Sequence, residues 1–211
     1  MTFRLQQIDE LLRPQHFFIE AEDNCYFLRE YTAGAGFGHG ETNSIISNLK
    51  KPVDRRGLPE WRYKESAIRQ AGRELRAAVG DELLRQFTIV PMPPSLSRSN
   101  SLYDDRMARI VRYMTEGLSC DVRELIVQPH DMMAAHSTSS RPKPDAWYAA
   151  YTVDEMLAQP PPVNVLVVDD VLTAGAHFAG LKRRLVERFP GAGVYAVFYA
   201  RRAVQQDSAT E

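Results

Sequence analysis

The chain has 211 residues, enough to bury a sizeable core, and its 44% hydrophobic and 25% charged residues are those of an ordinary globular protein. A formal net charge of −1 gives no general basic surface for nucleic acid, and the two cysteines lack the Cys-x-x-Cys spacing of a zinc site. No run approaches the roughly 18 apolar residues of a membrane span and no signal peptide is recognisable, so we expect a cytoplasmic protein.

Residues 1–57 are expected to form a small N-terminal cap. Within it, residues 3–12 are predicted as a short helix and residues 25–31 as a strand. The glycines of the turn at residues 33–40 fall at every second position, which does not give the Gly-x-Gly-x-x-Gly spacing of a dinucleotide loop. This turn is either a mobile connection or a lid over a substrate. A polar linker, residues 52–57, ends the cap.

From residue 58 onward, segments of helical and strand periodicity alternate. Helices are predicted at residues 61–80, 103–118, 145–157 and 178–189. Strands are predicted at residues 87–90, 125–127, 165–168 and 194–200. Strands that alternate with helices predict a parallel sheet with right-handed crossovers, so we expect an α/β core at residues 58–204 and a polar, flexible tail at residues 205–211.

The most informative segment runs from Val165 to His177. Four apolar residues lead into Asp169 and Asp170, as a buried parallel strand does where it reaches the surface at its carboxyl end. The small residues at 173–176 allow backbone N–H groups to approach an anion, and an amphipathic helix begins behind them. This order predicts a sugar diol on the acids and a phosphate at the helix N-terminus. The alternative is an acidic pair at a strand-to-turn junction that holds no ligand.

This segment resembles the PRPP-binding signature of type I phosphoribosyltransferases, and its loop is similar to that of orotate phosphoribosyltransferases and ComF-type proteins. The resemblance implies the fold of that family, a parallel sheet flanked by helices with a small N-terminal cap. It also implies that Asp169 and Asp170 bind the ribose 2- and 3-hydroxyls of PRPP and hold Mg²⁺ indirectly, through the ribose and water. The implied contacts of the 5-phosphate are Thr173, Ala174, Gly175, Ala176 and His177. His177 departs from the pattern, since the family usually has a small or hydroxyl residue there.

The same resemblance implies a second loop that binds the pyrophosphate of PRPP. Residues 89–95 leave a predicted strand at the right place, and Pro93, Ser95 and Arg98 are the expected contacts. Arg98 and Arg106 are the nearest cations in sequence. In the family this loop often carries a cis peptide bond, which an X-Pro bond permits at a cost of about 0.5–1 kcal/mol. The alternative is a proline-rich connector with solvated arginines.

The long stretch at residues 130–143 is a third candidate, because long loops without regular structure are usually functional or disordered. Its Arg141 resembles an arginine of ComF-type proteins, which implies that this loop closes over the transition state and brings a cation to the pyrophosphate. The alternative is a flexible surface loop.

Two functional hypotheses follow. The first is a phosphoribosyltransferase that uses Mg²⁺, binds PRPP and transfers its ribose 5-phosphate to a nucleobase or other acceptor with release of pyrophosphate; its expected catalytic residues are Asp169, Asp170 and Arg141. The second is a non-catalytic regulator or effector subunit that senses PRPP on the same fold. The expected partners are PRPP and a small-molecule acceptor, without a membrane or nucleic acid, and a homodimer is left open. A near-neutral chain that binds such an anion must concentrate its cations locally.

Overall fold

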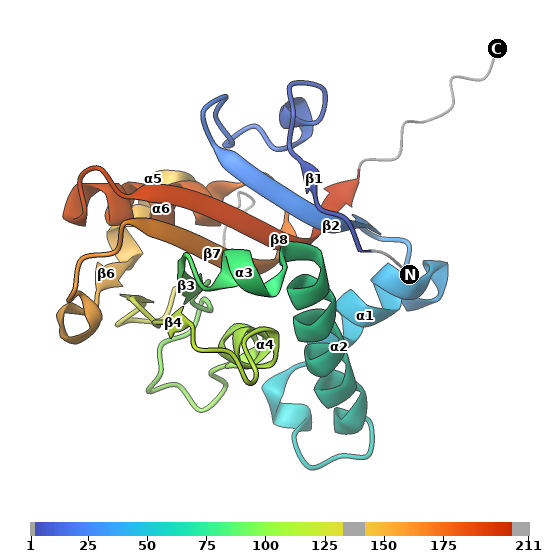
Figure 1. Cartoon of the computed structure of the whole chain (residues 1–211). Helices are drawn as coiled ribbons and strands as arrows, with labels where there is room; N and C mark the ends of the chain where they lie inside the picture. The colour runs from blue at the N-terminus through green and yellow to red at the C-terminus, as the bar shows by residue number, and fades with distance from the viewer. Residues whose placement is uncertain (1–2, 133–141, 204–211) are drawn as a thin grey trace.

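The computed structural model describes residues 3–132 and 142–203 (Figure 1). Arg141 and the middle of the predicted loop at residues 130–143 lie outside this part of the chain. Within the described residues, no helix is long and apolar enough to cross a membrane.

A six-stranded sheet with the order β1-β2-β8-β7-β3-β4 runs through the molecule. Its strands are β1 (Gln6–Gln7), β2 (Asn24–Thr32), β3 (Thr88–Pro91), β4 (Asp121–Val122), β7 (Asn164–Leu172) and β8 (Gly193–Ala203). All neighbours from β2 to β4 pair in parallel, and β1 pairs antiparallel with β2. The predicted α/β class with a mostly parallel sheet is therefore confirmed.

Helices cover both faces of this sheet, as Figure 1 shows. One core cluster joins the sheet to α1 (Glu41–Leu49), α2 (Trp61–Val79) and α4 (Arg106–Met114), and α3 (Asp81–Leu84) adds Leu84 to it. The other cluster joins the opposite face to α5 (Pro144–Ala150) and α6 (Ala176–Arg188). Alternate residues of β7 enter the two clusters, as the two-residue period of a strand requires. Short 3-10 turns complete the chain at Arg13–Gln15, Phe37–His39, Val53–Arg55 and Glu155–Leu157.

The predicted helix at residues 3–12 is absent, because this segment pairs with the sheet instead. β1 lies beside β2, and the Ile8 N–H donates to the Cys25 carbonyl at 2.9 Å. The Asp9 carboxylate then accepts the N–H groups of Leu11 and Leu12, both at 3.0 Å, which closes a turn. Tertiary hydrogen bonds have thus overridden a helical pattern of apolar residues.

The region between β3 and β7 also differs from its prediction. The predicted strand at residues 125–127 is β5 (Ile126–Val127), which pairs antiparallel with β6 (Thr152–Val153) in a separate two-stranded sheet, and β4 takes the edge of the main sheet. The predicted helix at residues 145–157 ends at Ala150, because the β-branched residues of β6 pair with β5. The predicted helix at residues 103–118 is shortened to α4.

Residues 1–57, the range predicted as a cap, supply β1, β2 and α1. β2 pairs with β8 from Asn24 opposite Tyr195 to Thr32 opposite Ala203, so this range extends the main sheet. The glycine-rich turn follows β2, and the Asn43 side-chain amide holds it by donating to the carbonyls of Thr32 (2.8 Å) and Gly36 (3.1 Å).

Candidate functional site

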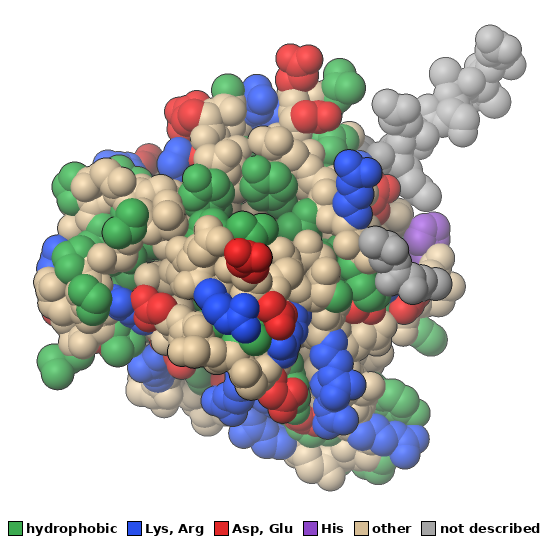
Figure 2. Space-filling view, viewed as in Figure 1, with side chains coloured by type: hydrophobic (Ala, Val, Ile, Leu, Met, Phe, Trp, Pro, Cys, Tyr) green, Lys and Arg blue, Asp and Glu red, His purple; other side chains and the backbone are tan. Residues whose placement is uncertain are grey.

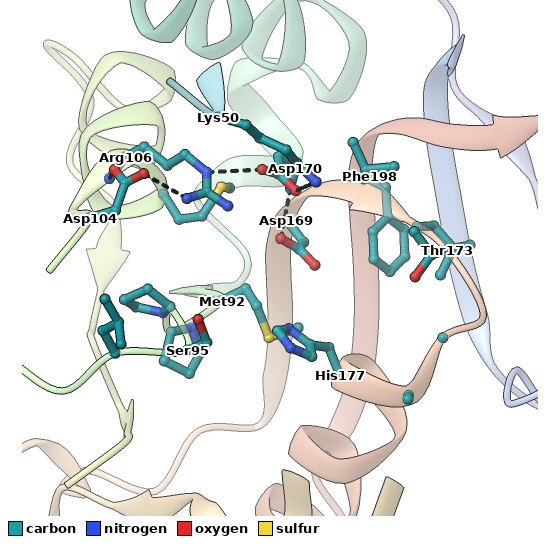
Figure 3. A pocket seen from close by; sticks show the side chains of 18 of the residues that line it. Lys50, Met92, Ser95, Asp104, Arg106, Asp169, Asp170, Thr173, His177 and Phe198 are labelled. Atoms are coloured by element: carbon teal, nitrogen blue, oxygen red, sulfur yellow. Dashed lines mark hydrogen bonds and ion pairs between the residues drawn. The ribbon is translucent and has the colours of Figure 1, made fainter. Parts of the chain in front are cut away.

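A cavity of about 280 Å³ lies at the carboxyl ends of β3 and β7, between the first residues of α4 and those of α6 (Figure 3). Ligands of open α/β sheets bind at this edge. The cavity brings together most of the predicted site residues, which are Pro93, Ser95, Asp169, Asp170, Thr173, Gly175, Ala176 and His177. The segment around Pro93 thus lies beside the acidic pair, where the resemblance implied that it would be.

Both acids of the pair are buried, in contrast to the prediction that they stand at an exposed strand end. Asp169 is 8% exposed and Asp170 is 4% exposed. The reason is that β7 does not stop at the acids: its pairing with β8 continues to Leu172, which lies opposite Arg201. The Asp170 N–H donates to Asp169 Oδ1 at 2.7 Å, so the two residues are also linked to each other.

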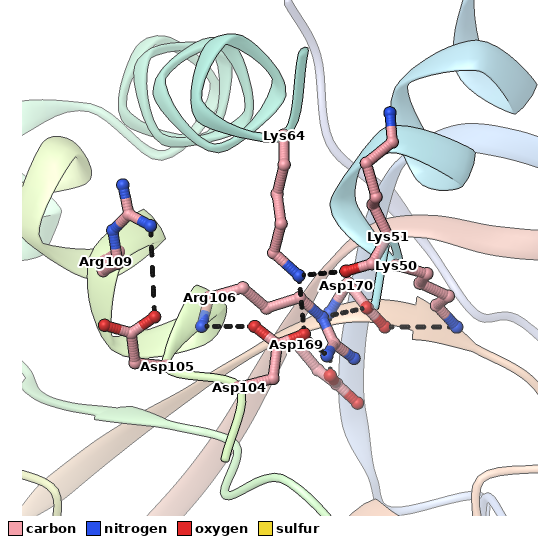
Figure 4. A network of polar contacts seen from close by, with 9 residues as sticks. All are labelled: Lys50, Lys51, Lys64, Asp104, Asp105, Arg106, Arg109, Asp169 and Asp170. Atoms are coloured by element: carbon pink, nitrogen blue, oxygen red, sulfur yellow. Dashed lines mark hydrogen bonds and ion pairs between the residues drawn. The ribbon is translucent and has the colours of Figure 1, made fainter. Parts of the chain in front are cut away.

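Two cations face Asp170 from helices that lie far apart in sequence (Figure 4). Arg106, at the start of α4, donates from Nε to Asp170 Oδ2 at 2.9 Å, and Lys50, just after α1, places Nζ 3.6 Å from Asp170 Oδ1. Burial on its own raises the pKa of this carboxyl, but the charges of Arg106 and Lys50 outweigh it and lower the pKa to about 2. Asp170 is therefore a buried but ionised carboxylate.

A second layer of charges fixes Arg106. Its Nη1 donates to Asp104 Oδ2 at 2.7 Å, and Lys64 Nζ donates to the same oxygen at 2.7 Å and to the Lys51 carbonyl at 2.8 Å. Lys64 is fully buried, and burial lowers its pKa despite the neighbouring carboxylate. Because this network joins α2, α4 and the end of α1, it holds the backbone beside Lys50 as well as the Arg106 guanidinium.

Lys50 begins a segment rich in cations. Figure 2 shows Lys and Arg side chains gathered on the lower part of this face, around the connection between α1 and α2. The sequence there contains Lys51, Arg55 and Arg56 next to Lys50. Lys51, Arg55 and Arg56 are not among the described residues that line the cavity, where Lys50 and Arg106 lie beside Asp104, Asp169 and Asp170.

Asp169 has the opposite electrostatic character to its neighbour. Burial, and after it the charge of Asp170, raise the pKa of Asp169 to about 7. The pair therefore holds one carboxylate that stays ionised and one that exchanges a proton near neutral pH.

Contacts with the N-terminal part of the chain orient the backbone of the loop before α6. Gly175 has φ +92°, and a Cβ there would lie 2.7 Å from Ile19 Cδ1, so only glycine fits. The carbonyl of Thr173 is hydrogen-bonded to His16 Nδ1, and the carbonyl of Ala174 accepts the Phe18 N–H at 2.9 Å. In a trans peptide the next N–H points the opposite way, so the N–H groups of Ala174 and Gly175 face away from this segment. The first N–H groups of α6 also have no partner within their own helix.

His16 was not predicted as a site residue. Its side chain is fully buried, and burial lowers its pKa, which favours a neutral ring. A neutral ring that donates from Nδ1 has no proton on Nε2, and Nε2 has no hydrogen-bond partner among the described residues. The donated bond to Thr173 therefore determines which tautomer is present.

His177 lies in the first turn of α6, as predicted, and lines the cavity. Its ring also packs edge-on against Trp147, with 3.6 Å between ring centroids. Burial lowers the pKa of His177 to about 4. At neutral pH this residue therefore offers a neutral hydrogen-bonding group and a packing surface, without a positive charge.

Two predictions about the segment after β3 do not hold. Arg98 pairs with Glu124 at 2.5 Å and lines a neighbouring hollow instead of the main cavity. Residues 89–95 contain no cis peptide bond; the cis bond within the described ranges is Gln159–Pro160. The start of this segment continues the pairing of β3 with β7, since the Met92 N–H donates to the Val168 carbonyl at 2.9 Å. Arg106, named from sequence only as a nearby cation, takes the position at the acids.

The donor set suits magnesium only together with a phosphate ligand. Among the described residues, no group of three or more His, Cys, Asp or Glu side chains could hold a metal ion by itself. Mg²⁺ commonly keeps several waters and binds through one or two carboxylates and substrate phosphates, and Asp169 and Asp170 fit that use.

No protein-family model matches the chain, and a search of curated proteins found no match.

Proposed function

We propose that the chain binds PRPP with Mg²⁺ and transfers its ribose 5-phosphate to a small-molecule acceptor, with release of pyrophosphate. The observation that carries this proposal is the composition of one cavity. An ionised acid (Asp170), a titratable acid (Asp169), two cations (Lys50 and Arg106) and the start of α6 surround about 280 Å³. Each part of PRPP has a matching group there.

Different groups of the cavity bind different parts of PRPP in this proposal. The 5-phosphate takes the backbone N–H groups of residues 173–177, where the helix dipole favours negative charge. The ribose hydroxyls donate to Asp169 and Asp170, and the pyrophosphate lies toward Pro93 and Ser95, within reach of the Arg106 and Lys50 charges. Arg141, outside the described residues, stays a proposed catalytic residue.

The proposed transfer depends on the positioning of the reactants and on electrostatic stabilisation, without a covalent intermediate on the protein. As pyrophosphate leaves, C1 of the ribose gains positive character, and the cations beside the departing group stabilise its charge. Bound Mg²⁺ would supply further neutralisation of the phosphates. The ionised Asp170 orients the ribose, because a carboxylate is the stronger acceptor for a hydroxyl donor.

The test compares Mg-PRPP binding in the wild type with Asp169→Asn and Asp170→Asn, using the thermal shift of each protein relative to its own ligand-free state. Each charge-assisted hydrogen bond is worth about 1.5–3 kcal/mol, so affinity should fall at least about tenfold in each variant. Asp121→Asn removes an ion-paired carboxylate on β4, outside the cavity, and should bind like the wild type. Equal shifts in all four proteins would contradict the assignment.

Turnover is measured separately, as pyrophosphate release with a panel of nucleobases. Release that depends on Asp170 supports the transferase. Binding that depends on Asp170 without release under any acceptor would instead identify a PRPP-sensing regulator. No binding at all would remove PRPP as the ligand.

A further inference from the structure

A second cavity of about 670 Å³ lies on the other side of the loop before α6. Thr173, Ala176 and His177 line both cavities, so this loop is the wall between them. The rest of the second cavity comes from the N-terminal segment around Phe17 and Phe18 and from the start of α5. Its volume lies within the range of small-molecule sites, roughly 300–1,000 Å³.

The charged side chains among the described residues that line this second cavity are cations. Lys143 and Arg202 line it, and its described lining contains no Asp or Glu. Arg202 Nε is buried and has no hydrogen-bond partner in the described part of the chain; the same is true of Nε of the neighbouring Arg201, which donates from Nη1 to Gln15 Oε1 at 3.0 Å. A buried N–H group without an acceptor is unfavourable, so the cavity is suited to a ligand that carries an anionic group.

The other feature of the second cavity is its aromatic lining. Phe17 is 67% exposed, and its ring centroid is 4.5 Å from that of Phe18; Trp147, which is 6% exposed, also contributes to the lining. Exposed aromatic side chains can stack on a planar ring, and the cations beside them can pair with an anionic group attached to that ring. The carbonyls of Thr173 and Ala174, which would repel an anion, are already hydrogen-bonded to His16 and Phe18.

We propose that the second cavity binds an aromatic anion of nucleotide size. The ring lies among Phe17, Phe18 and Trp147, and the anionic group pairs with Lys143 and Arg202. Inorganic phosphate alone would leave the aromatic walls uncovered, and a neutral ring would leave Arg202 without an acceptor. The proposal does not depend on PRPP, because the ligand occupies the opposite face of the loop.

Trp147 provides a local reporter for this site. The chain has two tryptophans, so Trp61→Phe leaves Trp147 as the only one. AMP is the probe, adenosine tests the ring without the anion, and inorganic phosphate tests the anion without the ring. We expect a saturable change in Trp147 fluorescence with AMP, and binding of the other two at least about tenfold weaker. Calorimetry on the same series detects binding that leaves the fluorescence unchanged.

Variants in the second cavity locate the probe. Arg202→Gln, Lys143→Gln and Phe18→Leu should each weaken AMP about tenfold or more, and Phe18→Leu keeps the backbone bond to Ala174. Arg73→Gln is the matched control, since Arg73 lines a different hollow. Lys143 is exposed, so Lys143→Gln should fold normally. It tests whether the cations of the second cavity bind AMP even if Arg202→Gln fails to fold.

Four results would overturn the proposal. One is the absence of both heat and fluorescence change with AMP. Another is equal affinity for AMP and adenosine. A third is AMP binding that neither Arg202→Gln nor Lys143→Gln weakens. The last is AMP binding that Asp170→Asn abolishes while Arg202→Gln leaves it intact, because the nucleotide would then lie in the first cavity.

Discussion

Replacement of Asp169 by Asn tests the electrostatics of the acidic pair directly. The pKa of Asp169 is raised from 3.8 to about 7 in the folded protein, so between these values the folded state binds a proton that the unfolded chain does not. The stability from this proton is fully present below pH 3.8 and is lost as the pH rises through about 7. At about 1.4 kcal/mol per pKa unit, the loss reaches about 4 kcal/mol.

Asn resembles the protonated acid and does not titrate. The free energy of unfolding of the variant should therefore equal that of the wild type near pH 4. As the pH rises to 8, the variant should become more stable than the wild type, by at most about 4 kcal/mol. His177 acts in the opposite direction: its pKa is lowered from 6.5 to about 4, so its contribution grows over that range as pH rises. These two contributions largely cancel in the wild type between pH 4 and 6.5, so the difference between the two proteins is the informative quantity.

The assay is urea unfolding of wild type and Asp169→Asn at pH 4.5, 6, 7 and 8. Asp121→Asn is the control; the Arg123 guanidinium and the Thr88 hydroxyl help to hold the pKa of Asp121 below its usual value, so its effect should not vary over this range. A difference between wild type and Asp169→Asn that stays constant from pH 4.5 to 8 would refute the raised pKa.

One further prediction concerns the stability of the loop before α6, and two concern ligand binding. Gly175→Ala should lower the free energy of unfolding by about 1–3 kcal/mol, because it strains a left-handed position and crowds Ile19; chemical unfolding measures this, and an unchanged value would contradict the loop geometry. His16→Asn keeps a donor near the Nδ1 position, whereas His16→Gln moves it, so Asn should retain the PRPP-induced thermal shift better than Gln; similar shifts would make His16 only a packing residue. Ribose 5-phosphate and pyrophosphate, measured by calorimetry, should each bind at least about tenfold more weakly than PRPP, and parity would contradict a site that uses both ends of the ligand.

The sequence predicted the elements whose pattern is local. α2 carries a long amphipathic repeat that stops at Gly80, and the unit from β7 to α6 has an apolar run followed by small residues. β1, β4 and β5 have two residues each, too few to form a pattern, and their places depend on the strands they pair with. The end of the predicted helix at residues 145–157 was missed for the same reason.

The site was predictable to the same extent. Residues 169–177 are contiguous and carry a recognisable pattern, so they could be found. Lys50, Asp104 and His16 act on that segment from distant parts of the chain, and nothing in their own surroundings distinguishes them. Lys50 lies two residues before the predicted polar linker at residues 52–57. Its role became visible only when the fold placed it 3.6 Å from Asp170.

The burial of the acidic pair explains why those distant residues are needed. A carboxylate as buried as Asp170 must be paired, and Arg106 and Lys50 pair with it. A ligand that brought only hydroxyl groups would compete with these cations for Asp170. A ligand that brought only phosphates would draw the cations away and leave the carboxylate buried alone. In the proposed complex, the ribose hydroxyls of PRPP would donate to Asp170 while its pyrophosphate would pair with the same two cations, so neither the carboxylate nor the cations would lose all their partners.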